Sequence, residues 1–255
     1  MYFYSLKLIL ILRYFISFAY KGTHYHGWQE QPKAVSVQQV LTEAMCMVLK
    51  ENISLVAAGR TDAGVHAKQM YAHFDSVQTI DTEKLTVKLN SFLPFDIAIY
   101  RVFRTSETAH ARFDATARTY TYHITQQKNP FLKDTHWYFN QVLDVETMNQ
   151  ACEILKEYTN FQCFSKVHTD VKTFNCSIRQ AYWEQHDKQL VFTITADRFL
   201  RNMVRAIVGT LINVGLHKQS LADFRTIIES RNRSNAGFSV PAQGLFLVEI
   251  SYPYI

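Results

Sequence analysis

The sequence lacks the motifs that most directly reveal a cofactor. Its four cysteines are widely scattered and no two form a Cys-x-x-Cys pair, so neither a zinc site nor a disulfide framework is indicated. The dinucleotide-binding GxGxxG motif, the phosphate-binding Walker loop and the metalloprotease HExxH motif are absent as well. We therefore expect no metal and no cofactor, and free buried thiols in a reducing cytoplasm.

The sequence also lacks an apolar run of the about 20 residues that a membrane span requires. Lys7 precedes the apolar run 8–12 as in a signal peptide, but Arg13 ends the run after five residues and no small-residue cleavage site follows. We expect no membrane partner. Residues 1–12 are expected to be an N-terminal extension, either a lengthened first strand or the result of a translation start assigned too far upstream.

A strong charge of one sign is missing too. Lys and Arg number 27 and Asp and Glu number 22, which gives a net charge of +5 in 255 residues. This mild excess permits a polyanionic partner but does not establish one, because affinity for phosphate depends on how charges cluster. The hydrophobic content of 47% is ordinary for a soluble globular protein, built as one large domain or two small ones.

The hydrophobic patterning predicts a mixed fold. Alternating segments predict strands at 13–20, 70–74, 97–103, 117–124, 178–184, 190–196 and 246–252. Apolar residues at helical spacing predict helices that begin near residues 36, 81, 144, 198 and 220. This order favours an α+β fold with helices on one face of a mainly antiparallel sheet. The order of elements runs twice, before and after about residue 130.

Local features refine the helices. Ser36 with Gln39 predicts a capping box at the start of the first helix, and Ser220 with Asp223 predicts another at the start of the last. In the second helix, Phe92 follows two leucines at helical spacing, so we expect it to belong to the buried stripe.

Two irregular segments combine aromatic and basic residues. In 21–32, exposed aromatic and histidine side chains would suit stacking on bases, or Tyr25 and Trp28 simply cover the core. A metal bound by the two histidines of this segment is disfavoured because nothing supplies the remaining ligands. The segment 161–176 is expected to be a basic surface loop, with its lysines and His168 in solvent.

The segment 57–67, AAGRTDAGVHA, carries the clearest chemical pattern. Two glycines flank an Arg-Thr-Asp tripeptide, which predicts a tight loop between two strands. Asp62 is its only carboxylate, and Arg60, His66 and Lys68 lie within six positions of it. A carboxylate in this positive potential would stay ionised at neutral pH and be available as a nucleophile. The alternative is a surface ion pair beside a bend stabilised by the threonine.

Two further segments combine core residues with polar groups. In 117–124, Tyr120 and Tyr122 share one strand face, and a buried tyrosine face is the simple interpretation. In 198–215 a strong apolar stripe indicates a core helix with three arginines near its start. Cations there oppose the helix dipole, at a cost of a few tenths of a kcal/mol each, which indicates phosphate or carboxylate partners. These arginines are Arg198, Arg201 and Arg205.

Taken together, four segments resemble the tRNA pseudouridine synthase A family, and the resemblance covers residues 13–252. The nine residues 59–67, GRTDAGVHA, are similar without interruption to the family signature, in which the aspartate, here Asp62, is the nucleophile. The Arg-x-Tyr-x-Tyr of 118–122 resembles a second motif, whose first tyrosine, here Tyr120, stacks on the target uracil.

The other two segments lie in the second half of the chain. The segment 199–209, FLRNMVRAIVG, resembles the third family motif, whose second arginine, here Arg205, pairs with the nucleophilic aspartate. The segment 241–247, PAQGLFL, resembles the closing motif, whose leucine, here Leu245, packs against the base in the active site. The family more often has Thr-Ala before that proline, where this sequence has Ser-Val.

The resemblance implies a fold, a substrate and an assembly. It implies two ferredoxin-like α+β halves whose antiparallel sheets form a central cleft, with an N-terminal half at 13–130 that carries the nucleophile loop and a C-terminal half at 131–255. It implies an isomerase that converts uridine to pseudouridine in the anticodon stem-loop of tRNA, acts as a homodimer and uses no cofactor, because the reaction neither oxidises nor loses a group.

In that enzyme Tyr120 and Leu245 would enclose an extruded uracil, and arginines and lysines would contact phosphates or remain solvated. The candidate substrate-binding residues besides these two are Arg60, Thr61, Arg112, Arg118, Lys166, Lys172 and Arg201. The point at which Asp62 attacks, at C1′ or C6 or by removing a proton beside C1′, stays open. Two rival functions also stay open: an RNA-binding module or chaperone without chemistry, and an enzyme that hydrolyses nucleosides to free base.

Overall fold

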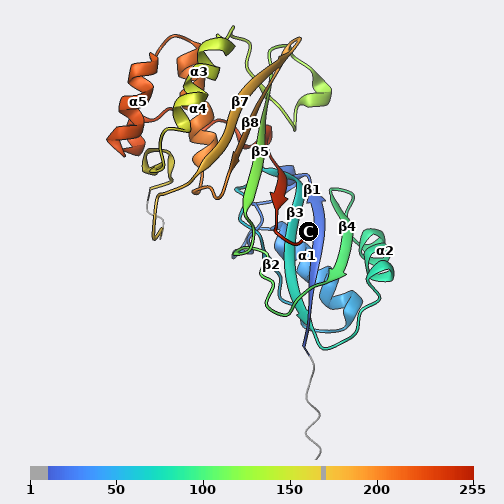
Figure 1. Cartoon of the computed structure of the whole chain (residues 1–255). Helices are drawn as coiled ribbons and strands as arrows, with labels where there is room; N and C mark the ends of the chain where they lie inside the picture. Colours follow the sequence, from blue (N-terminus) through green and yellow to red (C-terminus); the bar gives the residue numbers. More distant parts are fainter. Residues whose placement is uncertain (1–10, 168–170) are drawn as a thin grey trace, which may run out of the picture.

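The computed structural model describes residues 11–167 and 171–255 (Figure 1). The strands are β1 Leu12–Tyr20, β2 Val56–Ala57, β3 His66–Ser76, β4 Ile97–Arg104, β5 Ala117–Thr125, β6 Trp137–Tyr138, β7 Ile178–His186, β8 Gln189–Ala196 and β9 Leu245–Ser251. The helices are α1 Val37–Leu49, α2 Thr82–Phe92, α3 Val145–Leu155, α4 Met203–Gly215 and α5 Leu221–Ser230. Of the expected extension at 1–12, residues 1–10 lie outside the described residues. Leu12 is the first residue of β1.

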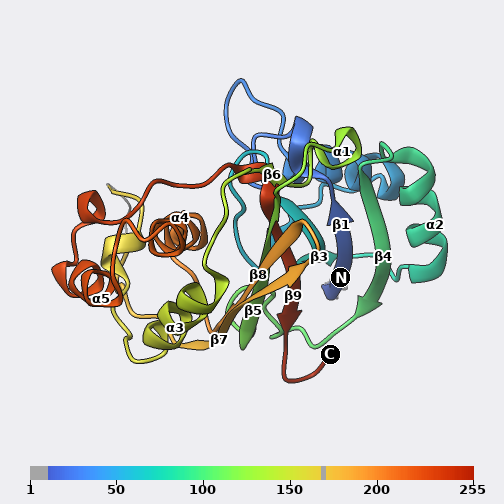
Figure 2. The same cartoon turned by 90° about the horizontal axis from the view of Figure 1, so that it is seen from above.

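One nine-stranded sheet runs through the described chain in the order β4-β1-β3-β9-β5-β8-β7, with β2 added beside β3 and β6 beside β5. The neighbours along this order pair antiparallel except β3 and β9, which pair in parallel through His66 with Phe246 and Ala67 with Leu247. The last strand of the chain therefore lies in the middle of the sheet, between β3 and β5 (Figures 1 and 2). A large, mainly antiparallel sheet with helices confirms the α+β class.

Two apolar cores lie along this sheet. Helices α1 and α2 lie beside β1, β3 and β4, whereas α3, α4 and α5 lie beside β7 and β8 (Figures 1 and 2). One core contains Phe15 and Phe18 of β1, and the other contains Phe192 of β8 and most of α4. Tyr120 of β5 packs against both. The expected boundary at residue 130 and the arrangement of two ferredoxin-like halves around a cleft stay predictions.

The helix ends follow the predicted chemistry with two exceptions. Ser36 accepts a hydrogen bond from the Gln39 N–H, but the Gln39 side chain donates to Glu43 one turn later and so closes no capping box. Phe92, expected in the core, is 51% exposed because α2 ends there. Leu93, in extended conformation at the helix end, fills the core position instead. The capping box of Ser220 with Asp223 is confirmed.

The structure decides between the alternatives for the segment 21–32 and differs from expectation in two further segments. Tyr25 and Trp28 are buried, so they cover the core. The segment 161–176 begins inside the core, because Phe161 precedes a short 3-10 turn, Phe164 ends it, and both are fully buried. Only its later part is a surface loop, and its His168 lies outside the described residues. The expected helix 198–215 starts only at Met203. Within 11–167 and 171–255, every helix is too short or too polar to cross a bilayer.

Candidate active site

The loop that carries Asp62 connects β2 to β3 and is closed by its own backbone. The Val65 N–H donates to the Asp62 carbonyl at 3.1 Å, and Gly64 between them has a φ of +77°, a conformation that side chains rarely adopt. The glycine is therefore required by the turn, and the turn sets the direction in which the Asp62 side chain leaves the backbone.

The segment 21–28 holds this loop from one side. The main-chain N–H of Trp28 donates to the Thr61 carbonyl at 3.3 Å, and the main-chain N–H of Gly64 donates to the Tyr25 carbonyl at 3.2 Å. Gly27 has a φ of +85°, and a Cβ atom there would lie 2.4 Å from the Thr61 carbonyl oxygen. Only glycine permits this approach, so the segment is a support for the loop that carries Asp62.

Thr61 is fixed by a residue that the sequence alone does not indicate. Its hydroxyl lies 2.8 Å from the hydroxyl of Tyr20, the last residue of β1. Tyr20 is 4% exposed, and burial raises the pKa of its phenol far above the ordinary value. The neutral hydroxyl therefore stays available to hydrogen-bond Thr61, the immediate neighbour of Asp62.

Two arginines from the C-terminal half of the chain face the Asp62 carboxylate. The Arg205 Nη1 atom lies 3.6 Å from Oδ2, and the Arg201 Nε atom lies 3.7 Å from Oδ1. The Asp62 side chain is 26% exposed, and the Arg205 side chain is 20% exposed. Arg205, in the first turn of α4, also donates from Nε to the buried Val240 carbonyl at 2.7 Å, which fixes its guanidinium. The structure thus brings together Asp62 and Arg205, 143 positions apart in the sequence.

Tyr120 lies near this ion pair. Its ring meets the Phe199 ring edge-on, with centroids 5.2 Å apart. Burial raises the pKa of Tyr120 to about 12, the negative charge of Asp62 adds to the shift, and Arg118 opposes it. Tyr120 is therefore a neutral phenol whose electrostatic environment includes the Asp62 carboxylate, and its stacking on a uracil stays a prediction.

Leu245 begins β9 and is 6% exposed in the core around α4. The segment before it is held by Tyr122, whose hydroxyl donates to the Pro241 carbonyl at 2.8 Å. A Cβ atom on Gly244 would lie 2.8 Å from the Tyr122 ring, so this glycine lets the segment pack directly on the tyrosine. The buried Tyr122 face was predicted, but its hold on Pro241 was not.

The remaining candidate residues differ in how exposed their side chains are. The Arg118 guanidinium donates to four main-chain carbonyls, those of Ala58, Arg112, Ala115 and Asp197, and so joins β5 to the segment that leads into the loop with Asp62. Arg60, Arg112, Lys166, Lys172 and Arg201 are exposed. The proposed contacts of these five residues and of Arg118 with phosphate stay predictions.

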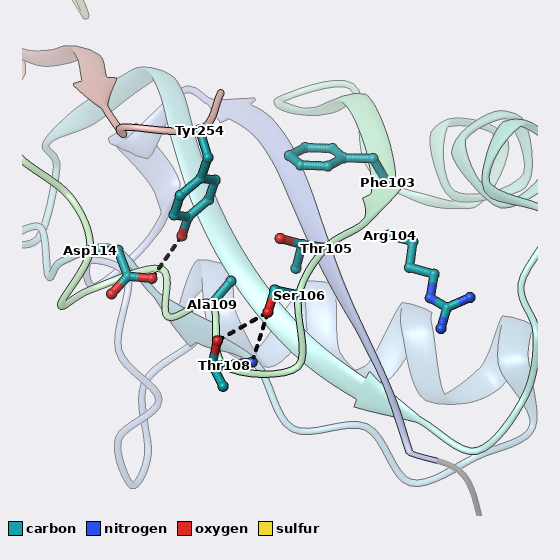
Figure 3. Close-up of a pocket in the computed structure, with 8 residues that line it drawn as sticks. All are labelled: Phe103, Arg104, Thr105, Ser106, Thr108, Ala109, Asp114 and Tyr254. Atoms are coloured by element: carbon teal, nitrogen blue, oxygen red, sulfur yellow. Dashed lines mark hydrogen bonds between the residues drawn. The ribbon is translucent and has the colours of Figure 1, made fainter.

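A cavity of about 370 Å³ lies elsewhere, at the ends of β4 and of the chain (Figure 3). Its lining residues are Phe103, Arg104, Thr105, Ser106, Thr108, Ala109, Asp114 and Tyr254. None of them is a predicted site residue. Within the described part of the chain, no cluster of three or more His, Cys, Asp and Glu side chains is placed to hold a metal ion.

Comparisons with known proteins agree with the motifs. The family model described as tRNA pseudouridine synthase matches residues 16–114 and 156–253. A Bacteroides fragilis protein named tRNA pseudouridine synthase A is 54% identical over 245 residues, which are 95% of this chain and 97% of that protein. A Porphyromonas gingivalis protein of the same name is 53% identical over 245 residues, 94% of this chain and 97% of that protein. The chain therefore belongs to the tRNA pseudouridine synthase family.

Proposed function

We propose that this chain is an enzyme that isomerises uridine to pseudouridine in tRNA, with Asp62 as the nucleophile. The observation that carries the proposal is the state of the Asp62 carboxylate. Two arginine nitrogens lie 3.6 and 3.7 Å away, yet the carboxylate accepts no hydrogen bond from the described residues. The two positive charges lie beside the carboxylate, and its oxygen lone pairs remain free for a substrate.

The reaction breaks the bond between N1 and C1′ and forms a bond between C5 and C1′. The uracil turns between the two steps, a proton leaves C5 to solvent, and N1 gains one. Asp62 can act at C1′, at C6 or on the proton beside C1′, and each route requires an ionised and accessible carboxylate. Arg205, which is fixed by its hydrogen bond to the Val240 carbonyl, keeps the carboxylate oriented during all steps of the reaction.

Tyr120 and Leu245 form the walls for the uracil in this proposal. A uridine must leave its stack to reach Asp62, and an aromatic face and an apolar side chain replace the neighbouring bases. Tyr120 shares its electrostatic environment with Asp62, and Leu245 starts the strand that pairs with β3 and β5. Arg60, Arg112 and Arg201 are exposed and contact phosphates of the tRNA.

The finer assignments come from the family resemblance. The names of the relatives give tRNA as their substrate. For this chain we propose the anticodon stem-loop as the target. The chain is proposed to act as a homodimer in the cytoplasm. Sedimentation of the purified protein tests the dimer, and mapping of modified nucleotides in isolated tRNA tests the target.

The test of the function is tritium release from tRNA labelled at C5 of uridine, because forming pseudouridine expels that hydrogen. The wild-type chain is expected to release tritium and to form pseudouridine in the anticodon stem-loop. Asp62→Asn and Asp62→Ala are expected to stay folded and to form none, and Asp62→Asn keeps tRNA binding. Wild-type activity in Asp62→Ala would refute the nucleophile.

The same assay separates the rival functions. A non-catalytic RNA-binding module binds tRNA but releases no tritium with either the wild type or the variants. A nucleoside-hydrolysing enzyme leaves free uracil in the reaction and an abasic site in the tRNA. Chromatography of the released material and of the digested tRNA distinguishes both outcomes from isomerisation.

A further inference from the structure

His66, the first residue of β3, joins three segments that lie far apart in the sequence. It is 1% exposed. Its Nδ1 atom accepts a hydrogen bond from the Gly22 N–H at 3.0 Å, and its Nε2 atom lies 3.0 Å from the Gln243 carbonyl oxygen. The ring stacks on Phe246 of β9, with centroids 4.5 Å apart. Both polar atoms of this buried imidazole are therefore paired with main-chain groups.

These two hydrogen bonds select one form of the ring. Nδ1 faces an N–H and must carry a lone pair, whereas Nε2 faces a carbonyl oxygen and must carry the proton. Protonation of Nδ1 would place two N–H groups against each other. Only the neutral imidazole with its proton on Nε2 satisfies both partners.

The surroundings of His66 also favour the neutral form. Burial lowers the pKa of His66 below its ordinary value. Lys21 lowers it further, while Asp134 and the hydrogen bond to Gln243 oppose the shift. Lys68 on the same strand and His123 on β5 add no negative charge.

Each partner of His66 belongs to a segment that builds the candidate active site. Gly22 lies in the segment that holds the nucleophile loop, and a Cβ atom there would lie 2.0 Å from the Val65 carbonyl oxygen. Gln243 lies two residues before Leu245. The main chain itself links β3 to β9 through only two residue pairs, so the imidazole adds a third connection at the end nearest Asp62.

We propose that His66 is a positioning residue: as a neutral Nε2–H imidazole, it sets the separation between the Asp62 loop and the Leu245 wall. The proposal rests on the proposed function, because that function gives Leu245 its contact with the uracil. His66 itself touches no substrate atom. Its loss would let the wall shift relative to the nucleophile, and a misplacement of about 1 Å can reduce a rate by about 100-fold.

Three substitutions separate the two hydrogen bonds. His66→Gln can place an amide N–H near the Nε2 position and keep the bond to Gln243, but it loses the acceptor for Gly22. His66→Asn keeps an acceptor near the Nδ1 position and loses the bond to Gln243. His66→Phe keeps the ring stacked on Phe246 and loses both.

The measurement is kcat and KM for tRNA in the tritium-release assay, beside the melting temperature of each variant. If His66 positions Leu245, His66→Asn and His66→Phe lose about 10- to 100-fold in kcat with KM changed by less than about 2-fold. His66→Gln recovers at least about a third of the wild-type kcat, because it keeps the bond that matters for the wall. Equal kcat values for the Gln and Asn variants would overturn the proposal.

His73 provides a matched control on the same strand. It is 5% exposed and its Nδ1 atom accepts from the Ala111 N–H at 3.1 Å, so it is also a buried, neutral histidine bonded to the main chain. Its partner lies in the loop beside the cavity of Figure 3 rather than beside Asp62. His73→Phe, matched to His66→Phe, loses this bond and is expected to lower the melting temperature but to keep kcat at saturating tRNA.

The pH profile gives a readout that a purely structural role would not move. In the wild type, kcat is expected to fall at acid pH as His66 gains a proton and Nδ1 can no longer accept from the Gly22 N–H. His66→Gln has no such proton to gain, so its kcat falls at lower pH. Identical acid limbs in both proteins would contradict the positioning role. If the wild type forms no pseudouridine at all, the proposed function fails instead.

Discussion

Replacing Arg205 by methionine removes the cation nearest Asp62 while leaving a side chain of similar length in α4. Two unit charges at the observed 3.6 Å attract by about 1 kcal/mol at the dielectric constant of water and by about 5 kcal/mol at an effective value of about 20. With 26% of the Asp62 side chain and 20% of the Arg205 side chain exposed, solvent screens part of this attraction. We therefore take about 2–3 kcal/mol as the contribution of this attraction to holding the carboxylate in place for the reaction.

At about 1.4 kcal/mol per factor of ten, this contribution predicts a loss of about 30- to 160-fold in kcat for Arg205→Met. KM for tRNA is expected to change little, because Arg205 is only 20% exposed and faces the carboxylate. Single-turnover tritium release with enzyme in excess measures the chemical step directly. Arg205→Met within about 3-fold of the wild-type rate would refute the role of the ion pair.

Arg205→Lys separates the charge from the second contact of this arginine. It keeps a cation but loses the Nε donor to the Val240 carbonyl, which is buried. Both variants leave that carbonyl without its partner, which costs about 1–3 kcal/mol of stability, so their melting temperatures should fall together. Because only the lysine variant keeps the charge, its rate should lie between those of the methionine variant and the wild type.

Four further predictions test other parts of the site and fold. Tyr120→Ala should lose far more activity than Tyr120→Phe, because the phenylalanine keeps the ring that stacks on the uracil; equal rates would contradict the stacking role. Arg201→Ala should raise KM and flatten the salt dependence of tRNA binding, since this arginine is 59% exposed, and filter binding at several salt concentrations checks it. Gly27→Ala should lower both melting temperature and kcat, because the new Cβ would lie 2.4 Å from the Thr61 carbonyl oxygen. Burial lowers the pKa of His73 to about 4, so the unfolded chain binds the proton more readily. Stability should fall as pH drops from about 6.5 towards 4, and urea unfolding of His73→Gln should show a weaker dependence.

The regular elements could be predicted from the sequence because their causes are local. Alternation placed β5 and β8 within one or two residues of their observed ends, and the acidic caps Asp81 and Asp144 start α2 and α3 as hydrogen-bonded N-caps. The failures have a different origin. Helical spacing placed Phe92 in the core, but α2 ends there, and the packing of the next residue decided which side chain was buried.

The residues that support the site could not be found this way, because their partners are distant in sequence. Tyr20 looks like any strand aromatic until its hydroxyl is seen beside Thr61, 41 positions away. His66 pairs with a carbonyl 177 positions away. The glycines at 22 and 27 did offer a local clue, since two glycines in a short aromatic segment indicate close backbone contacts. The nearness of Asp62 to Arg205 was suggested only by the family resemblance.

The Asp62–Arg205 contact is longer than a hydrogen-bonded ion pair. Oppositely charged groups that are free to approach settle at about 2.7–2.9 Å, yet here the nearest nitrogen and oxygen are 3.6 Å apart. The attraction of the pair therefore does not set its own distance. The backbone near the pair includes the short parallel pairing of β3 with β9, and the Gln69 side chain beside this pairing accepts from the Ile250 N–H at 2.7 Å. At this separation the carboxylate faces two cations but accepts no hydrogen bond from the described residues, so its oxygens stay open to a substrate, as a nucleophile requires.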